Sequence, residues 1–150
     1  MAVLMAASAG MTAMAAASGD ITVVSREDGS GTRGAFIELM GVEEKDADGN
    51  KVDNTTESAK ITNSTAVMLS TVAEDVNAIG YISLGSLNDT VTAVKIDGAE
   101  ASAEAIEDGS YKVVRPFNIV TTAEVSDAAA DFISYIMSTE GQAVVADNGY

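Results

Sequence analysis

A strand pattern, a glycine-rich turn and a helix pattern follow one another between residues 20 and 40. Ile21–Val24 is a short β-branched run typical of a buried strand, and it ends at Ser25 in a polar turn. Thr32–Met40 then places its apolar residues at the spacing of one helix face. A buried strand that leads through a tight turn into a helix is the building unit of sheets covered by helices. The sequence therefore predicts the α/β fold class from residue 20 onward.

The chain beyond residue 40 continues with further patterns. Ser64 is placed to cap a helix that runs to Val76, and Ser126 to cap an amphipathic helix that runs to Met137 with its apolar face buried. A last apolar turn or helix begins at Gly141. We also predict extended segments at Ile79–Leu84, Val91–Ile96, 112–114 and 118–122, a turn at Asp97-Gly98, a short helix at 101–107 and a long acidic loop at 41–62.

The composition excludes several classes of chemistry. With 150 residues, of which 47% are hydrophobic and 21% charged, the chain is long enough for one globular domain with a sizeable core. It contains no cysteine and no histidine. Disulfides, thiolate nucleophiles, Cys/His zinc sites and imidazole acid–base steps are therefore excluded. What remains is binding, and chemistry that uses oxygen atoms.

The charge balance argues against anionic macromolecules as partners. Eight Lys and Arg residues against 23 Asp and Glu residues give a formal net charge of −15. Such a surface repels the phosphate backbone of nucleic acids and anionic lipid headgroups. We therefore predict no nucleic-acid partner and no polybasic attachment to a membrane surface.

Residues 1–19 form an N-terminal segment that differs from the domain predicted at residues 20–150. The segment is rich in alanine, carries no charged side chain and holds four of the seven methionines. A signal peptide is one alternative, because Ala15–Ala17 are small, although a basic n-region is missing. A transmembrane helix is another, although so much Ala, Ser and Gly makes a weak one. The composition favours a soluble helix over residues 3–17, buried against the domain.

The most informative segment is the turn Ser25–Arg33, which joins the predicted strand to the predicted helix. Such a turn directs free backbone N–H groups and the positive end of a helix dipole at one point. Ser30 and Thr32 add hydroxyl donors, and Gly31 allows close approach to the backbone. These features favour the binding of a tetrahedral anion. The alternative is an ordinary glycine-rich surface turn with helix caps.

Two charged residues of the same turn strengthen the anion interpretation. The guanidinium of Arg26 is a fork that matches two oxygens of a tetrahedral anion, and Asp28 is placed to hold that guanidinium in position. The turn is not a Walker-type phosphate loop, because no lysine follows its last glycine. It is not a dinucleotide-binding fingerprint either, because the G-x-G-x-x-G spacing is missing.

The acidic stretch offers a rival site of a different kind. Its oxygen-bearing residues follow the spacing of an EF-hand calcium loop at five positions, namely Asp46, Asp48, Asn50, Asn54 and Glu57. Lys51 replaces the glycine that this loop needs for its turn, so a solvated loop is favoured and calcium is the alternative. An enzyme of the Ser–Lys hydrolase type has little support, because no lysine lies near Ser30 in the sequence. We predict no enzymatic activity.

Nearly all of the chain after residue 19 resembles one known family. ITVVSREDGSGTRGAFIEL closely resembles the anion-binding loop and following helix of the phosphate-binding proteins that serve ABC phosphate importers. The later segments resemble that family in its own order, namely NSTAVMLSTVAEDVNAIGYISLG, VTAVKIDGAEAS, GSYKVVRPFNIVTT and SDAAADFISYIMSTEGQAVVADNGY. The resemblance implies a type II periplasmic-binding-protein fold, in which two α/β lobes close on one dehydrated phosphate. It also implies an extracytoplasmic location and an ABC permease as partner, without a cofactor or metal.

Five residues of this chain match residues of the family's phosphate site. By the resemblance, Arg26 matches the phosphate-contacting arginine and Asp28 the aspartate that pairs with it. The hydroxyls and amides that cradle the anion correspond to Ser30, Gly31 and Thr32. Glu27 and Arg33 stay outside the predicted site.

The resemblance is incomplete at the N-terminus. The family segment that supplies contacts from the opposite lobe, including an acidic acceptor for protonated phosphate, has no counterpart, and residues 1–19 stand in its place. The resemblance therefore implies one lobe plus the C-terminal part of the other, and half of the phosphate site, which a homodimer is one way to complete. The alternative functions are a calcium-binding acidic module and a structural domain that has lost its ligand.

Overall fold

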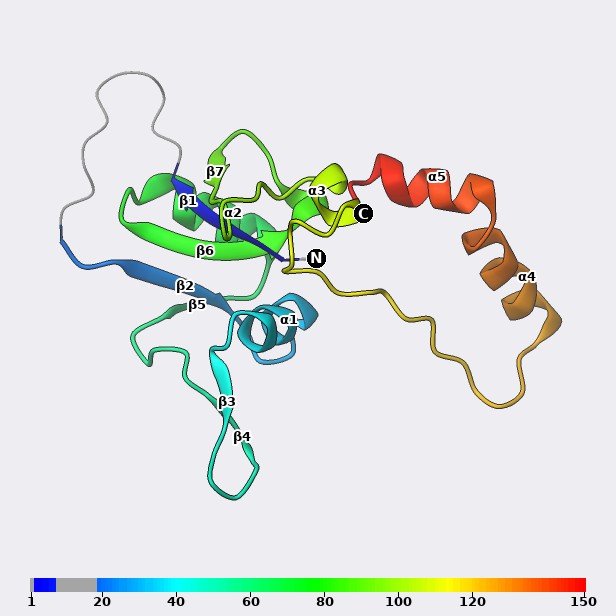
Figure 1. The fold of residues 1–150 in the computed structure, drawn as a ribbon, viewed down its shortest axis with the longest axis horizontal. Coiled ribbons are helices and arrows are strands. Elements are labelled where there is room, and N and C mark those ends of the chain that lie inside the picture. The colour runs from blue at the N-terminus through cyan, green and yellow to red at the C-terminus, as the bar shows by residue number, and fades with distance from the viewer. Residues whose placement is uncertain (1, 8–18) are drawn as a thin grey trace.

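The computed structural model describes residues 2–7 and 19–150, and its centre is a five-stranded sheet with the order β5-β2-β6-β1-β7 (Figure 1). The strands β2, β5 and β6 run parallel, whereas β1 lies antiparallel between β6 and β7. A separate pair of strands, β3 and β4, forms a hairpin. The strand bounds are β1 (Ala2–Ala7), β2 (Thr22–Arg26), β3 (Glu43–Lys45), β4 (Lys51–Asp53), β5 (Lys60–Thr62), β6 (Ala78–Ser83) and β7 (Val91–Ala93).

Serine side chains cap each of the five α-helices in the described part of the chain. The helices are α1 (Gly31–Leu39), α2 (Thr65–Glu74), α3 (Ala103–Glu107), α4 (Asp127–Ile136) and α5 (Thr139–Asp147), with a 3₁₀-helix η1 at Leu84–Ser86. In each α-helix the serine before the first residue accepts a hydrogen bond from a backbone N–H of the first turn. The sequence-predicted helices after residue 31 are therefore confirmed, with small shifts of their ends. Within the described part of the chain, no helix combines the length and the apolar character needed to cross a membrane.

Helices α1 and α2 cover opposite faces of the sheet. Successive residues of a strand point to opposite faces. In β6, Ile82 belongs to the same buried cluster as Met68 of α2, whereas Tyr81 stacks on Phe36 of α1 with ring centroids 4.1 Å apart. The chain therefore forms helix, sheet and helix layers, which confirms the predicted α/β class.

The main core lies between the sheet and α2. Its buried side chains are Met5, Val24, Met68, Val72, Ala78, Ile82 and Val91. Gly80 of β6 permits close packing here, because a Cβ at this position would lie 2.5 Å from Sδ of Met68. A second buried cluster around Tyr111 and Val113 packs against Phe36 of α1. The two clusters fix both helices on the sheet.

The helix predicted over residues 3–17 is wrong at its N-terminal end. Ala2–Ala7 form β1, in which Met5 pairs with Gly80 of β6 and with Ala93 of β7. Alanine favours a helix in isolation, but here β6 pairs with Ala2–Ala6 on one side and β7 with Met5–Ala7 on the other, and these pairings offer the backbone partners that a helix would otherwise supply. The rest of the predicted helix lies outside the described residues.

The acidic stretch predicted as a loop contains three short strands. β3 and β4 pair with Glu43 opposite Asp53, and β5 joins the main sheet beside β2. At the hairpin tip, Asp46 Oδ1 accepts hydrogen bonds from the backbone N–H groups of Asp48 and Asn50, at 2.9 and 2.8 Å. The prediction is wrong here because strands of three mostly exposed residues lack the apolar alternation by which a strand is recognised.

The region after β6 follows the predictions in part. The turn at Asp97-Gly98 is confirmed, because both residues have positive φ, 51° and 83°, and Ile96 pairs with Ala99 across it. The strand predicted at Val91–Ile96 ends at Ala93. Residues 112–122 include the two segments predicted to be extended and hold no strand.

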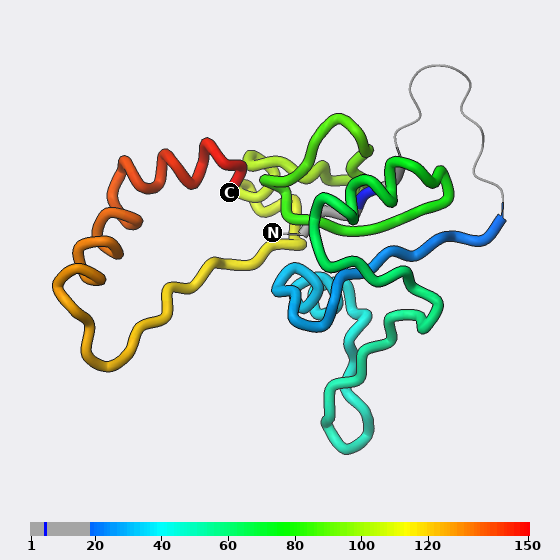
Figure 2. Tube along the Cα trace, turned by 180° about the vertical axis from the view of Figure 1, so that it is seen from behind, coloured from blue at the N-terminus to red at the C-terminus, as the bar shows by residue number. Residues whose placement is uncertain are grey.

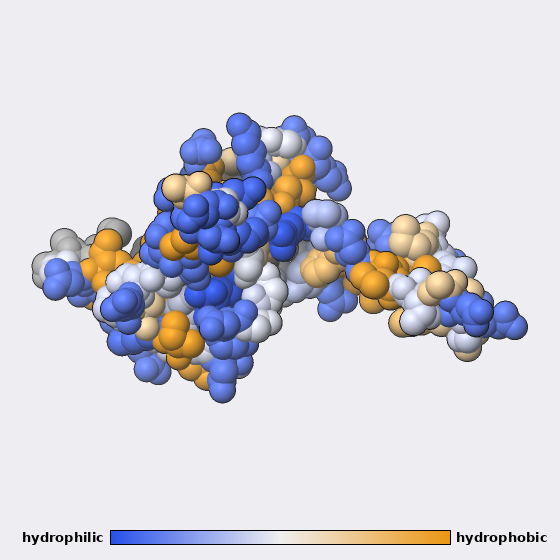
Figure 3. Space-filling model, turned by 90° about the horizontal axis from the view of Figure 1, so that it is seen from below, coloured by the Kyte–Doolittle hydropathy of each residue, from blue (hydrophilic) through white to orange (hydrophobic). Residues whose placement is uncertain are grey.

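The C-terminal helices α4 and α5 pack on each other and extend away from the sheet (Figures 1 and 2). The face of α4 that the sequence predicts to be buried is Ala129, Phe132, Ile133 and Ile136, and it is only half covered: Ala129 and Phe132 are exposed, Phe132 by 63%, whereas Ile133 and Ile136 are half-buried. Figure 3 shows apolar side chains gathered on this part of the molecule. An amphipathic pattern shows that a helix face needs a partner but not where that partner lies, so the prediction of burial is wrong for Ala129 and Phe132.

Candidate anion-binding site

Three parallel strands end at one edge of the sheet, and two helices begin there. β2 ends at Arg26, β5 at Thr62 and β6 at Ser83. Because α1 follows β2 and α2 follows β5, the positive ends of two helix dipoles lie at this edge. Ligands of open α/β sheets bind outside the carboxyl ends of the strands. The fold therefore places the turn after β2 where a ligand site is expected.

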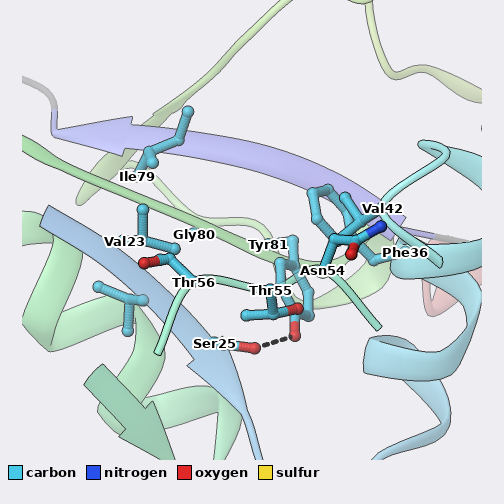
Figure 4. Close-up of a pocket in the computed structure, with 11 residues that line it drawn as sticks. Val23, Ser25, Phe36, Val42, Asn54, Thr55, Thr56, Ile79, Gly80 and Tyr81 are labelled. Atoms are coloured by element: carbon cyan, nitrogen blue, oxygen red, sulfur yellow. Dashed lines mark hydrogen bonds between the residues drawn. The ribbon is translucent and has the colours of Figure 1, made fainter. Parts of the chain in front are cut away.

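A buried hydroxyl network holds the backbone of Arg26. Tyr81 Oη accepts a hydrogen bond from the Arg26 N–H at 3.0 Å and shares a second one of 2.7 Å with Ser25 Oγ. Figure 4 shows this second bond at an apolar pocket of about 200 Å³ that Phe36 and Val42 also line. Hydrogen bonds in such surroundings are costly to break. The end of β2 is therefore held firmly beneath the Arg26 side chain.

The guanidinium of Arg26 is oriented by Glu27 and Thr65. Its Nε and Nη2 donate to the two carboxylate oxygens of Glu27 at 2.8 and 2.9 Å, and its Nη1 donates to Thr65 Oγ1 at 3.4 Å. The hydrogen bonds from Arg26 hold the pKa of Glu27 below its usual range. Glu27 occupies one forked edge of the guanidinium, so the Nη1/Nη2 edge is the one that can receive two oxygens of an anion.

Asp28 does not pair with Arg26, contrary to the sequence prediction. Its exposed carboxylate lies 3.6 Å from Nη1 of Arg33, and Arg33 also forms an ion pair with Asp53 of β4. Glu27, which the prediction left out, takes the place assigned to Asp28 because it directly follows Arg26 and its longer side chain reaches both nitrogens of one edge. The signal that identifies this pair is an acid next to the arginine.

The first turn of α1 presents the other donors. Ser30 Oγ accepts the Arg33 N–H at 3.3 Å, and the Ser30 N–H already donates to the Glu27 carbonyl at 3.0 Å. The amides of Gly31 and Thr32 have no acceptor among the described residues, as expected for the first residues of a helix. A Cβ at Gly31 would meet no atom within 4 Å, so the space beside this residue is open.

A hollow of about 200 Å³ lies beside the start of α1. It is lined by Gly31, Thr32 and Ala35 of α1, by Ser83 at the end of β6, and by the segment Arg115–Phe117. A water molecule takes up roughly 30 Å³ of liquid volume, so the hollow has room for a small tetrahedral anion. Of the five predicted site residues, only two, Gly31 and Thr32, line this hollow, whereas Arg26 stands at the neighbouring strand end.

The rival calcium site finds no support in the described part of the chain. No group of three or more His, Cys, Asp or Glu side chains there could hold a metal ion. Asp46 uses its carboxylate to close the hairpin tip, including a hydrogen bond of 3.0 Å from Asn50 Nδ2.

Tyr81→Phe tests the hydroxyl network, and we expect it to lower the free energy of unfolding by about 1–3 kcal/mol. The variant keeps the ring stacked on Phe36 but leaves Ser25 Oγ and the Arg26 N–H without Tyr81 Oη. Urea unfolding followed by circular dichroism measures the change. Tyr135→Phe is the matched control, because Tyr135 is 51% exposed and its hydroxyl is expected to contribute less than about 0.5 kcal/mol. Equal stabilities of the two variants would contradict the structural role of Tyr81 Oη.

The fold is a sheet covered by helices on both faces, and the candidate site lies at the carboxyl edge of its parallel strands. Residues 9–140 match the model of a family described as the PBP superfamily domain. The chain belongs to this superfamily.

Similar proteins extend this result. The phosphate-binding protein PstS 2 of Streptococcus agalactiae serotype V is 59% identical over 133 residues, which are 88% of this chain and 45% of that protein. The crystal structure of a phosphate ABC transporter, phosphate-binding protein from Streptococcus pneumoniae TIGR4, matches with a TM-score of 0.78 and 54% identity over 88% of this chain and 51% of that one. A putative phosphate ABC transporter substrate-binding protein from Clostridium perfringens, solved with bound phosphate, matches with a TM-score of 0.75 and 43% identity over 86% of this chain and 50% of that one. The chain spans about half the length of the relatives it matches.

Proposed function

We propose that this chain binds inorganic phosphate at the carboxyl edge of its sheet, as part of the solute-binding component of an ABC phosphate importer. The observation that carries the proposal is that Gly31 and Thr32, whose amides have no acceptor among the described residues, line a hollow at the carboxyl edge of the sheet, where Arg26 ends the strand that leads into α1. In the proposed site these three residues donate to the anion, Ser30 caps α1, and Asp28 meets Arg33 beside the turn.

The similar proteins support the wider role. Relatives named for phosphate binding and phosphate ABC transport are 59% and 54% identical to this chain over the matched residues. We therefore extend the proposal to a permease as the partner and to an extracytoplasmic location. The proposed role is capture of a solute, and it requires neither a cofactor nor a chemical step.

The strongly negative net charge does not prevent anion binding. A compact chain of this length has a radius of roughly 19 Å, and a phosphate at the surface of a sphere of charge −15 is repelled by roughly 1.5 kcal/mol at physiological salt. Four charge-assisted hydrogen bonds of about 1.5–3 kcal/mol each outweigh this repulsion. The net charge slows the encounter more than it weakens the complex.

The proposed binding is weak in this chain alone. The proposed donors all approach from one lobe, whereas a closed cleft surrounds an anion from two sides and excludes water. Four missing hydrogen bonds to charge, at about 1.5 kcal/mol each, correspond to roughly 6 kcal/mol or about four orders of magnitude in Kd. We therefore propose millimolar affinity and poor selectivity against sulfate.

Titrations with phosphate, sulfate and calcium at constant ionic strength test the proposal. Calorimetry is expected to show millimolar phosphate binding and no calcium heat, and nuclear magnetic resonance is expected to show shifts at the amides of Gly31 and Thr32. A flat phosphate titration would overturn the proposed function. Submicromolar binding that excludes sulfate would overturn the one-sided site. Light scattering during the titration then tells whether a second copy completes the cleft, because the mass would double.

A further inference from the structure

Ser83 is a second hydroxyl-bearing residue, beside Thr32, that lines the hollow of the proposed site. It ends β6, the strand beside β2, and its Oγ lies 3.3 Å from Thr32 Oγ1. Both hydroxyls belong to the lining of the same hollow. Ser83 stands directly before η1, but its side chain makes no capping hydrogen bond there. The hydroxyl of Ser83 is therefore directed to Thr32 and the hollow.

The direction of the hydrogen bond between the Ser83 and Thr32 hydroxyls decides whether Thr32 can donate to an anion. Each hydroxyl carries one proton and can accept two hydrogen bonds. When Ser83 donates to Thr32, the Thr32 proton is free for another acceptor, and the acceptor closest to its helix start would be a bound anion. An anion favours this arrangement because its oxygens accept hydrogen bonds and the neighbouring amides of α1 already draw it to the same place.

We infer that Ser83 is a positioning residue of the phosphate site, which orients the Thr32 hydroxyl as a donor to the anion. The inference rests on the proposed function and adds to it a residue from a different strand. Without Ser83, the Thr32 hydroxyl rotates freely and must be ordered when phosphate binds, which weakens the complex. Ser83 acts on the anion only by orienting the Thr32 hydroxyl. Its effect on phosphate affinity should therefore disappear when that hydroxyl is removed, which would not happen if Ser83 only stabilised the fold.

The test is a double-mutant cycle on the full chain, with inorganic phosphate titrations followed by nuclear magnetic resonance. Ser83→Ala is expected to weaken phosphate binding about five- to tenfold, and Ser83→Thr, which keeps the hydroxyl, to restore most of the affinity. In a Thr32→Val background, the same Ser83→Ala change is expected to alter affinity by less than about twofold. Ser134→Ala on α4 is the matched control, because it removes an exposed hydroxyl far from the hollow.

Each outcome decides a separate point. Wild-type affinity in Ser83→Ala, or equal weakening with and without the Thr32 hydroxyl, overturns the role of Ser83 while the proposed function stands. If the unsubstituted chain gives no phosphate response, the proposed function fails and this inference fails with it. Should Ser83→Ala lose its folded spectrum, Ser83→Cys gives the same decision, because it keeps the volume and replaces the hydroxyl by a weak donor.

Discussion

Arg26→Ala is expected to remove saturable phosphate binding, with a loss of at least about 100-fold in affinity. The substitution deletes the full positive charge at the end of β2 and the Nη1/Nη2 edge that Glu27 leaves open. Two hydrogen bonds to charge at about 1.5–3 kcal/mol each correspond to this loss or more. A titration with phosphate up to tens of millimolar, followed at the amides of Gly31 and Thr32, measures it.

Two further variants make the Arg26 result specific. Arg26→Lys keeps the charge but not the fork, so we expect an intermediate loss of about tenfold. Lys95→Ala makes the same change in net charge at an exposed residue that pairs with Glu100, and it should leave the affinity within about twofold. Phosphate binding by Arg26→Ala at the level of the Lys95→Ala control would place the anion somewhere other than this edge.

Met68→Ala is expected to cause the largest loss of stability, about 2–5 kcal/mol. Met68 is fully buried in α2, and its sulfur fills the space above Gly80, where a Cβ would lie only 2.5 Å away. Chemical unfolding measures the loss. Met137→Ala is the matched control, because Met137 is 66% exposed and its truncation should change the free energy of unfolding by less than about 0.5 kcal/mol.

Gly80→Ala provides a second check on the same contact. Alone it should destabilise the protein, since the new methyl group meets the Met68 sulfur and Cγ2 of Val72, 3.1 Å away. In the Met68→Ala background the methyl group enters the cavity, so the two changes together should cost less than the sum of each alone. Additive effects would show that α2 does not pack on β6 as described.

Local chemistry explains which parts of the fold the sequence predicts. The sequence signals for the strand that ends at Arg26 and for the helices capped by Ser64 and Ser126 are local. Each signal lies in residues that are close neighbours in the sequence. Such signals need no knowledge of the rest of the chain. The strand β1 is different, because Ala2–Ala7 carry a helical composition and become a strand only through β6 and β7.

The sequence also predicts only part of the proposed site. Gly31 and Thr32 follow directly from the strand, turn and helix order, and both line the hollow. The partner of Arg26 is the adjacent Glu27, which adjacency and side-chain length identify, whereas the prediction of Asp28 rested on charge and on an anion site two residues further on. Ser83 has no sequence signal, because only the parallel pairing of β6 with β2 brings it beside the turn.

The place of β1 in the sheet has a consequence for how the protein forms during synthesis. Its residues leave the ribosome before those of β6 and β7, yet Met5 pairs with Gly80 and Ala93, which are made much later. A contact of such long sequence separation closes slowly, because chain entropy opposes it until the other elements are in place. We expect the α2-covered parallel strands to assemble before β1 is inserted. Until then the edges of β6 and β7 are open to pair with another chain, and a nascent chain held by a chaperone would be protected at this stage.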